Sequence, residues 1–240
     1  MPAPAPTPYL IASAAYLALV VALARTTLPP HQARLTLLAA AVHLPAAAFV
    51  PFLERAYWMP ARVGGGLLGI EDVLITAAVA SWAWYLVALR FAGRLGAPVP
   101  VREAFRRSLV PGGAVMAGYL ALWLGGIDPM TALIVTCVVG ALVGCALQPD
   151  LVPLAAWGAA ALAVVWTGLV AFTFALEPAF VHEWNLAGAW GRRLLGVPLG
   201  EIAWAAVFGA FWPTFLGHVF RVPLHAGAHA GDSMGEVTGP

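Results

Sequence analysis

The sequence predicts an all-α membrane protein: seven transmembrane helices, arranged as two parallel three-helix repeats joined by a linking helix (3+1+3). Two observations support this fold class. Hydrophobic residues make up 62% of the 240 residues and charged residues only 10%, which is typical of integral membrane proteins and outside the range of soluble domains. The chain also contains a repeat with an offset of 130 positions, and a repeat of this size sets the architecture. Four residues recur in register: Arg62, Gly66, Glu71 and Trp82 reappear as Arg192, Gly196, Glu201 and Trp212.

Seven apolar runs give the expected spans. No basic segment precedes the first, which favours a transmembrane helix over a cleaved secretory signal. The second contains Pro45 and Pro51, which kink a membrane helix without ending it when neighbouring helices satisfy the freed carbonyls. Only a short turn at residues 127–129 separates the fourth span from the fifth. The expected spans cover residues 9–24, 35–53, 67–91, 110–126, 130–147, 151–176 and 197–220.

The longer connections between the spans are polar. Residues 54–66 carry Tyr57 and Trp58 at the depth of the membrane interface, and residues 177–195 take the equivalent place in the second repeat. The connection at 94–108 is basic, and its charges have helical spacing. This pattern favours a surface helix on anionic lipid headgroups over nucleic-acid binding. The charged residues are Arg102, Glu103, Arg106 and Arg107.

The domain organisation follows from the repeat. We expect a first three-helix repeat with its basic loop at residues 1–108, a linking helix at 109–128, a second repeat at 129–221 and a mobile polar tail at 222–240. Because a single span links the two triplets, both repeats run in the same direction across the membrane.

The arginines near the span ends predict the orientation. Eight lie on the face that carries the carboxyl terminus and four on the other, which places the amino terminus outside and the carboxyl terminus inside. We therefore expect a multi-pass protein of a bacterial inner membrane. The inner set is Arg25, Arg34, Arg90, Arg94, Arg102, Arg106, Arg107 and Arg221, and the outer set is Arg55, Arg62, Arg192 and Arg193.

Glu71 and Glu201 lie at the same place in the two repeats, about one turn into the last span of each. For either residue alone, the helix macrodipole explains an acid in the first turn, and pairing with Arg62 or Arg192 is a further structural explanation. Two acids in matching positions favour a function, because ionisable residues kept inside membranes usually face the bundle interior.

Aromatic residues continue the helix face below each acid. Eleven positions separate Glu71 from Trp82 and Glu201 from Trp212, which brings each aromatic residue almost under its acid and about 16 Å further along the helix. We expect these side chains to line an apolar chamber below the carboxyls. The aromatic residues expected there are Trp82 and Tyr85 in the first repeat and Trp204, Phe208 and Trp212 in the second.

The residues around the two acids resemble the motif of a known family. Gly196-Val-Pro198-Leu-Gly200-Glu201 is similar to the Gly-x-Pro-x-Glu-Glu-like sequence that opens the last span of each module in the lycopene cyclase domain family, the bacterial heterodimeric and fungal fused carotenoid cyclases. Here Gly200 replaces the first Glu. The first copy has the acidic pair Glu71-Asp72 in the corresponding position, with Leu68 in place of the Pro. That family is a tandem of three-span modules, so the resemblance covers both repeats.

The resemblance implies cyclisation of the ψ-ends of lycopene or a related linear carotene to rings. This reaction is an acid–base isomerisation through a carbocation, and it needs neither flavin nor another cofactor nor a metal. Glu71 and Glu201 would be the acid and the base, with Asp72 as the next candidate. Desolvated aromatic faces stabilise a cation by about 2 kcal/mol each, which gives the aromatic residues below the acids a role. The residues implied as supporting ones are Arg62, Arg192 and Pro198.

The expected partners are a linear carotenoid and membrane lipid, together with a second copy of the chain or other carotenoid enzymes. The alternative is a non-catalytic seven-helix protein that binds or assembles carotenoids or lipids, or a small-molecule transporter. The sequence has a single Asn, Asn185, and two Gln, all outside the expected spans, which argues against a hydrophilic substrate. His43, His182 and His218 are dispersed, whereas an iron site would need several His in paired helical spacing.

Overall fold

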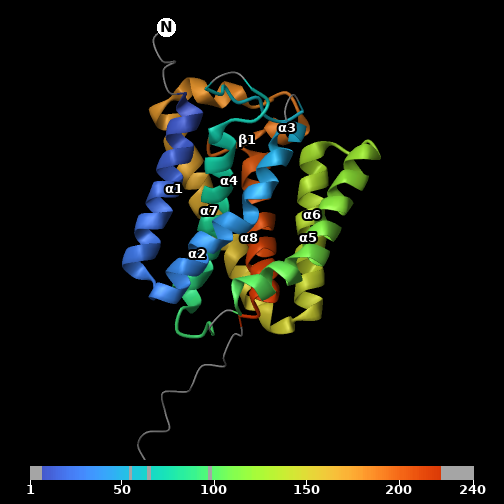
Figure 1. Cartoon of the computed structure of the whole chain (residues 1–240). Coiled ribbons are helices and arrows are strands. Elements are labelled where there is room, and N and C mark those ends of the chain that lie inside the picture. The colour runs from blue at the N-terminus through green and yellow to red at the C-terminus, as the bar shows by residue number, and fades with distance from the viewer. Residues whose placement is uncertain (1–6, 54–55, 64–65, 97–98, 223–240) are drawn as a thin grey trace, which may run out of the picture.

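The computed structural model describes residues 7–53, 56–63, 66–96 and 99–222. Within them the chain is a bundle of long, roughly aligned helices with short irregular segments at the ends (Figure 1). Arg55 and nearly all of the predicted tail lie outside the described residues. The elements are α1 (Pro8–Thr27), α2 (Pro30–His43), η1 (Leu44–Phe49), α3 (Val50–Leu53), α4 (Ile70–Phe91), α5 (Val101–Leu124), α6 (Pro129–Leu147), η2 (Pro149–Leu151), α7 (Val152–Leu176), η3 (Pro178–Glu183), η4 (Ala189–Gly191), β1 (Arg193–Leu194), β2 (Val197–Pro198) and α8 (Leu199–Phe220).

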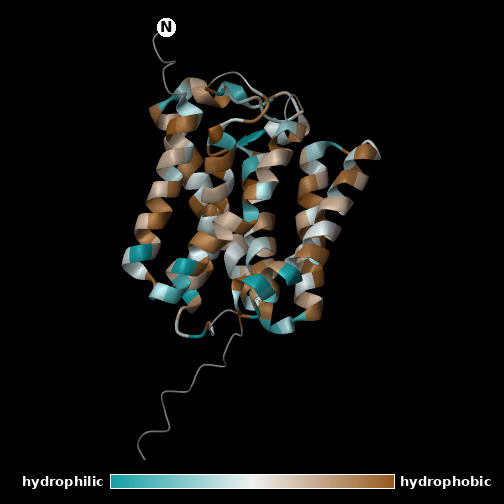
Figure 2. Ribbon diagram, viewed as in Figure 1, coloured by the Kyte–Doolittle hydropathy of each residue, from teal (hydrophilic) through white to brown (hydrophobic). Residues whose placement is uncertain are grey.

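Among the described residues, six helical segments are long and apolar enough to cross a membrane. Figure 2 shows hydrophobic residues along most of their length and hydrophilic residues mainly toward the two ends. The prediction of a multi-pass helical membrane protein is therefore confirmed for these six segments. They are Pro8–Thr27, Pro30–Leu53, Ile70–Phe91, Pro129–Leu147, Pro149–Leu176 and Leu199–Phe220.

Prolines lie at the starts of several of these helices and within the second span. α1 and α6 each begin with a proline after a residue whose side chain caps the helix, Thr7 for α1 and Asp128 for α6. The missing N–H of proline costs nothing at the first helical position. Near Pro45 the second span changes from α-helix to the tighter η1, and it returns to α-helix at Val50. The span continues past Pro45 and Pro51, as expected.

The basic segment forms part of a longer helix, which corrects the expectation of a separate surface helix. α5 begins at Val101, nine residues before the expected fourth span, and continues to Leu124 past Pro111. Glu103 and Arg107 form an ion pair of 2.8 Å along its first turns. α5 is not among the six apolar helices. The spacing of the charges correctly indicated a helix, but it could not show that the charged turns continue directly into the apolar turns of the same helix.

Two of the six apolar helices, α4 and α8, each pack against two others. α4 lies against α1 and α2, α8 lies against α6 and α7, and α4 also contacts α7 and α8 (Figure 1). α7 and α8 approach each other closely at Gly158 and Gly209. A Cβ on either glycine would meet the backbone carbonyl of the other, so only glycine permits this separation.

Two irregular segments join at the end of the bundle where α4 and α8 begin. Met59 N donates to Glu183 O (2.7 Å) and Asn185 N donates to Tyr57 O (2.8 Å), which forms an antiparallel bridge between Trp58 and Trp184. The two indole rings stack at 5.7 Å. The connection after the second span is thereby fixed to the connection before α8.

Candidate active site

A chamber of about 750 Å³ lies inside the helical bundle. Side chains from all the long helices line it, and most of them are apolar. Its volume is within the usual range of small-molecule sites. From Glu201 to Phe215, both of which line the chamber, α8 rises by about 21 Å. The chamber is therefore long as well as apolar, as expected from the sequence.

Glu201 provides the chamber with a carboxyl group held by three neutral donors. Tyr57 OH and Trp184 Nε1 each donate to Oε1 at 3.0 Å. Trp166 Nε1 donates to Oε2, also at 3.0 Å. Among the described residues no Arg or His forms an ion pair with this carboxyl. A carboxylate oxygen accepts about two hydrogen bonds, so Oε1 is saturated and the open position belongs to Oε2.

Gly200 makes room for the tyrosine that binds this carboxyl. A Cβ at position 200 would lie 2.5 Å from Tyr57 Cε2 and from its hydroxyl oxygen. Burial raises the pKa of Tyr57, and the neighbouring Glu201 raises it further, so the phenol keeps its proton and acts as a donor. The ring of Tyr57 therefore occupies the space that a larger side chain at position 200 would need.

A ladder of stacked rings runs along the chamber wall from Glu201. Trp204 stacks on Phe208 at 5.3 Å, and Phe208 on Trp212 at 5.7 Å. Trp212 in turn stacks on Phe215 at 5.3 Å. All four rings line the chamber, and three of them, Trp204, Phe208 and Trp212, are among the residues expected there. We call these four residues the aromatic ladder.

His43 of α2 faces the same ladder. The imidazole centroid lies 5.0 Å from that of Phe208 and 4.5 Å from that of Trp212, and the ring lines the chamber. Sequence reasoning noted this residue only as one of several dispersed histidines. The contact joins two helices that are far apart in the chain, so no residue spacing within α2 could predict it.

The acids of the first repeat do not line the chamber, so the expectation that Glu71 faces it is wrong. Both Glu71 and Asp72 are fully buried. Asp72 accepts from Arg62 Nε (2.6 Å) and Nη2 (3.1 Å), from Tyr9 OH (2.9 Å) and from Gly69 N (2.7 Å). Glu71 Oε1 accepts from Val63 N at 2.6 Å. These carboxyls are used to cap α4 and to fix the connection before it.

The expected aromatic lining of the first repeat is also wrong. Trp82 and Tyr85 are buried but do not line the chamber. Trp82 Nε1 donates to Tyr16 O of α1 (3.2 Å), and the Tyr85 hydroxyl lies 3.2 Å from that of Thr27. α4 is enclosed by other helices, so its aromatic face packs against α1.

The supporting residues differ between the repeats. Arg62 pairs with Asp72, whereas the Arg192 side chain is exposed, and only its carbonyl, which accepts from Leu199 N (2.6 Å), helps to start α8. Pro198 is buried and precedes the first residue of α8. The three donors to Glu201 were missed because they come from α7 and from two connections.

No group of three or more His, Cys, Asp or Glu side chains gathers as a metal site among the described residues. Comparison with protein-family models, with curated protein sequences and with solved structures finds no match to this chain.

Proposed function

We propose that this chain is a membrane-embedded cyclase that converts the ends of a linear carotene, such as lycopene, to rings by acid–base isomerisation. One observation carries the proposal. The carboxyl of Glu201 opens on a long apolar chamber, accepts hydrogen bonds from three neutral donors, and stands at the end of an aromatic ladder.

The reaction is derived from this one carboxyl. Oε2 of the neutral acid gives its proton to the terminal C=C of the carotene, so an O–H bond breaks and a C–H bond forms. The neighbouring C=C attacks the resulting cation and closes the ring with a new C–C bond. A carbon next to the new cation then returns a proton to the carboxylate, and a C=C forms in the ring. Nothing is oxidised or reduced, and Glu201 regains its proton.

The surroundings of Glu201 stabilise both charges of the intermediate. The carboxylate keeps its hydrogen bonds from Tyr57, Trp166 and Trp184, and hydrogen bonds to charged groups contribute about 1.5–3 kcal/mol each. The cation faces Trp204 and Phe208, and a desolvated ring contributes about 2 kcal/mol. Glu71 and Asp72 have no place in this scheme, because both are buried away from the chamber.

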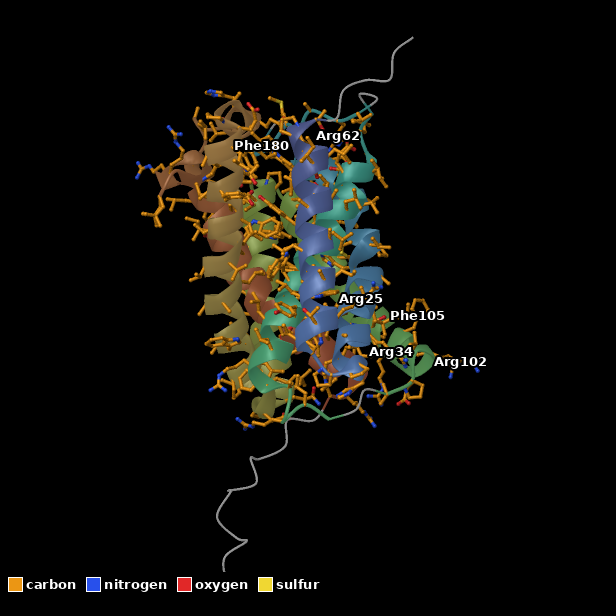
Figure 3. The ribbon with its side chains drawn as sticks, turned by 90° about the vertical axis from the view of Figure 1, so that its left-hand side faces the viewer. Arg25, Arg34, Arg62, Arg102, Phe105 and Phe180 are labelled. Atoms are coloured by element: carbon orange, nitrogen blue, oxygen red, sulfur yellow. The ribbon has the colours of Figure 1, made fainter. Side chains whose placement is uncertain are left out.

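We also propose that α5 is a seventh span and that α1, α2 and α4 form one copy, and α6, α7 and α8 the other, of a three-helix unit. The shared packing order supports this arrangement. A shift of 130 positions also carries α4 (Ile70–Phe91) onto α8 (Leu199–Phe220) to within one residue. For orientation, Figure 3 places Arg25, Arg34 and Arg102 at one end of the bundle and Arg62 at the other. We propose that the end with more arginines faces the cytoplasm.

The test is pigment analysis in a bacterial host that accumulates lycopene. We expect the wild-type chain to produce ring-bearing carotenes and Glu201→Gln to produce none, because the amide has no proton to transfer. The matched control is Glu71→Gln. Its ring-forming activity, divided by the amount of protein in the membrane as measured by immunoblot, should equal that of the wild type. Rings formed by Glu201→Gln, or a membrane-inserted wild type that leaves lycopene unchanged, would refute the proposal.

A further inference from the structure

A second hollow, of about 500 Å³, adjoins the chamber where α2 approaches the start of α5. The two share Leu38, Ala41 and Val101 as lining residues. In Figure 3, Arg34 lies near this end with Phe105, a chamber-lining residue, while Arg62 is at the far end. The chamber therefore has an acid toward one end and this hollow toward the other.

Two basic residues, His31 and Arg34, line the hollow, and no acid is among its lining residues. Within the described part of the chain, neither forms an ion pair with a carboxylate. Glu103, on the facing α5, pairs with Arg107. A linear hydrocarbon has no group that needs a cation, so the proposed cyclisation leaves these basic groups without a role.

The distance between the two ends fits one long amphiphile. Phe220 lines the hollow and is nineteen positions from Glu201, which corresponds to about 28 Å along α8. The hydrocarbon core of a bilayer is about 30 Å thick. A molecule whose chain fills the chamber would thus place its head at the membrane surface, beside Arg34. A guanidinium recognises phosphate with paired hydrogen bonds.

We infer that the hollow is the head site of a polyprenyl phosphate whose unsaturated chain lies in the chamber. The aromatic ladder decides the kind of chain, because aromatic rings along the length of the wall suit the double bonds and methyl groups of an isoprenoid. The phosphate accepts hydrogen bonds from Arg34 and from His31. This site does not depend on the proposed cyclisation, since binding requires neither Glu201 nor turnover.

Binding to the purified full-length protein in neutral detergent tests the inference. The probes are geranylgeranyl phosphate and geranylgeraniol, which differ only in the head, and binding is followed by native mass spectrometry. We expect the phosphate to bind the wild type at least tenfold more tightly than the alcohol. Arg34→Gln should remove this difference in affinity, because the amide cannot form the charged, paired hydrogen bonds that the guanidinium forms with phosphate. Because Arg34 is exposed, its replacement leaves the fold intact. The matched control is Arg25→Gln, which removes an exposed arginine at the same end that does not line the hollow.

A substitution in the chamber separates the contribution of the hydrocarbon chain to binding from that of the phosphate head. Gly112 lines the chamber, and Gly112→Phe should weaken the phosphate and the alcohol alike by filling the space for the chain. Equal affinities for the two probes in the wild type would overturn the inference, as would an unchanged affinity of Arg34→Gln for the phosphate. Displacement of geranylgeranyl phosphate by an equal concentration of phosphatidylglycerol would also overturn it, in favour of a diacyl lipid head. Failure of the cyclase assay would leave all these outcomes unaffected.

Discussion

Substitution of Gly200 tests whether the space at this position is needed for the Tyr57 ring that binds Glu201. The new Cβ of Gly200→Ala would lie 2.5 Å from Tyr57 Cε2 and from its hydroxyl oxygen, so the ring has to move. Overpacking of this kind costs about 1–3 kcal/mol. The displaced hydroxyl also loses its hydrogen bond to Glu201, worth about 0.5–1.5 kcal/mol while the acid is neutral and about 1.5–3 kcal/mol when it is charged during the reaction. We expect a loss of both stability and ring formation.

A double-mutant cycle with Tyr57→Leu assigns the loss to this contact. Tyr57→Leu removes both the ring and the hydroxyl, so Gly200→Ala should cost close to nothing in that background. The coupling free energy should therefore equal most of the cost of the single glycine substitution. The free energy of unfolding is measured in mixed detergent micelles, and ring formation in the lycopene-accumulating host. Additive costs of the two substitutions would refute the reasoning, because they would show that residue 200 does not act through Tyr57.

Two further predictions concern the other end segments. Arg62→Gln leaves the fully buried Asp72 carboxylate without its cation and should destabilise the protein by about 3–5 kcal/mol. Adding Asp72→Asn should restore part of this stability. A double variant no more stable than Arg62→Gln alone would contradict a stabilising ion pair between Arg62 and Asp72. Burial raises the pKa of Glu183 to about 7, so the folded state binds this proton more tightly than the unfolded chain does. The contribution is present below about pH 4.5 and is lost as the pH rises through 7. Glu183→Gln should flatten the fall in melting temperature between pH 5 and 8, and an unchanged slope would count against the shifted pKa.

The helices could be predicted because their signals are local. The six apolar segments and the continuation of the second span past Pro45 and Pro51 follow from composition and from residues a few positions apart. The bounds of α5 were harder to predict, since its charged first turns are continuous with its apolar part. Hydropathy detects that the apolar part exists, but the backbone hydrogen bonds that extend the helix into the polar part leave no trace in hydropathy.

The equivalence of Glu71 and Glu201 in sequence did not predict their different surroundings. A shift of 130 positions carries Asp72 onto Ile202, so the first repeat has a second acid, which Arg62 holds, and the second has none. Glu201 binds groups that are 144, 35 and 17 positions away. The repeat predicted the position of each acid along its helix, but the side to which it turns depends on which helices surround it.

The sequence by itself determined that this is a helical membrane protein and where its apolar helices lie, because the hydrophobic effect acts on composition and on periodicity within each segment. Only the tertiary structure decided that one of the two matching acids opens on a chamber while the other is sealed beside an ion pair. That choice rests on contacts between helices and connections far apart in the chain, and such contacts leave no periodic signal in the order of the residues.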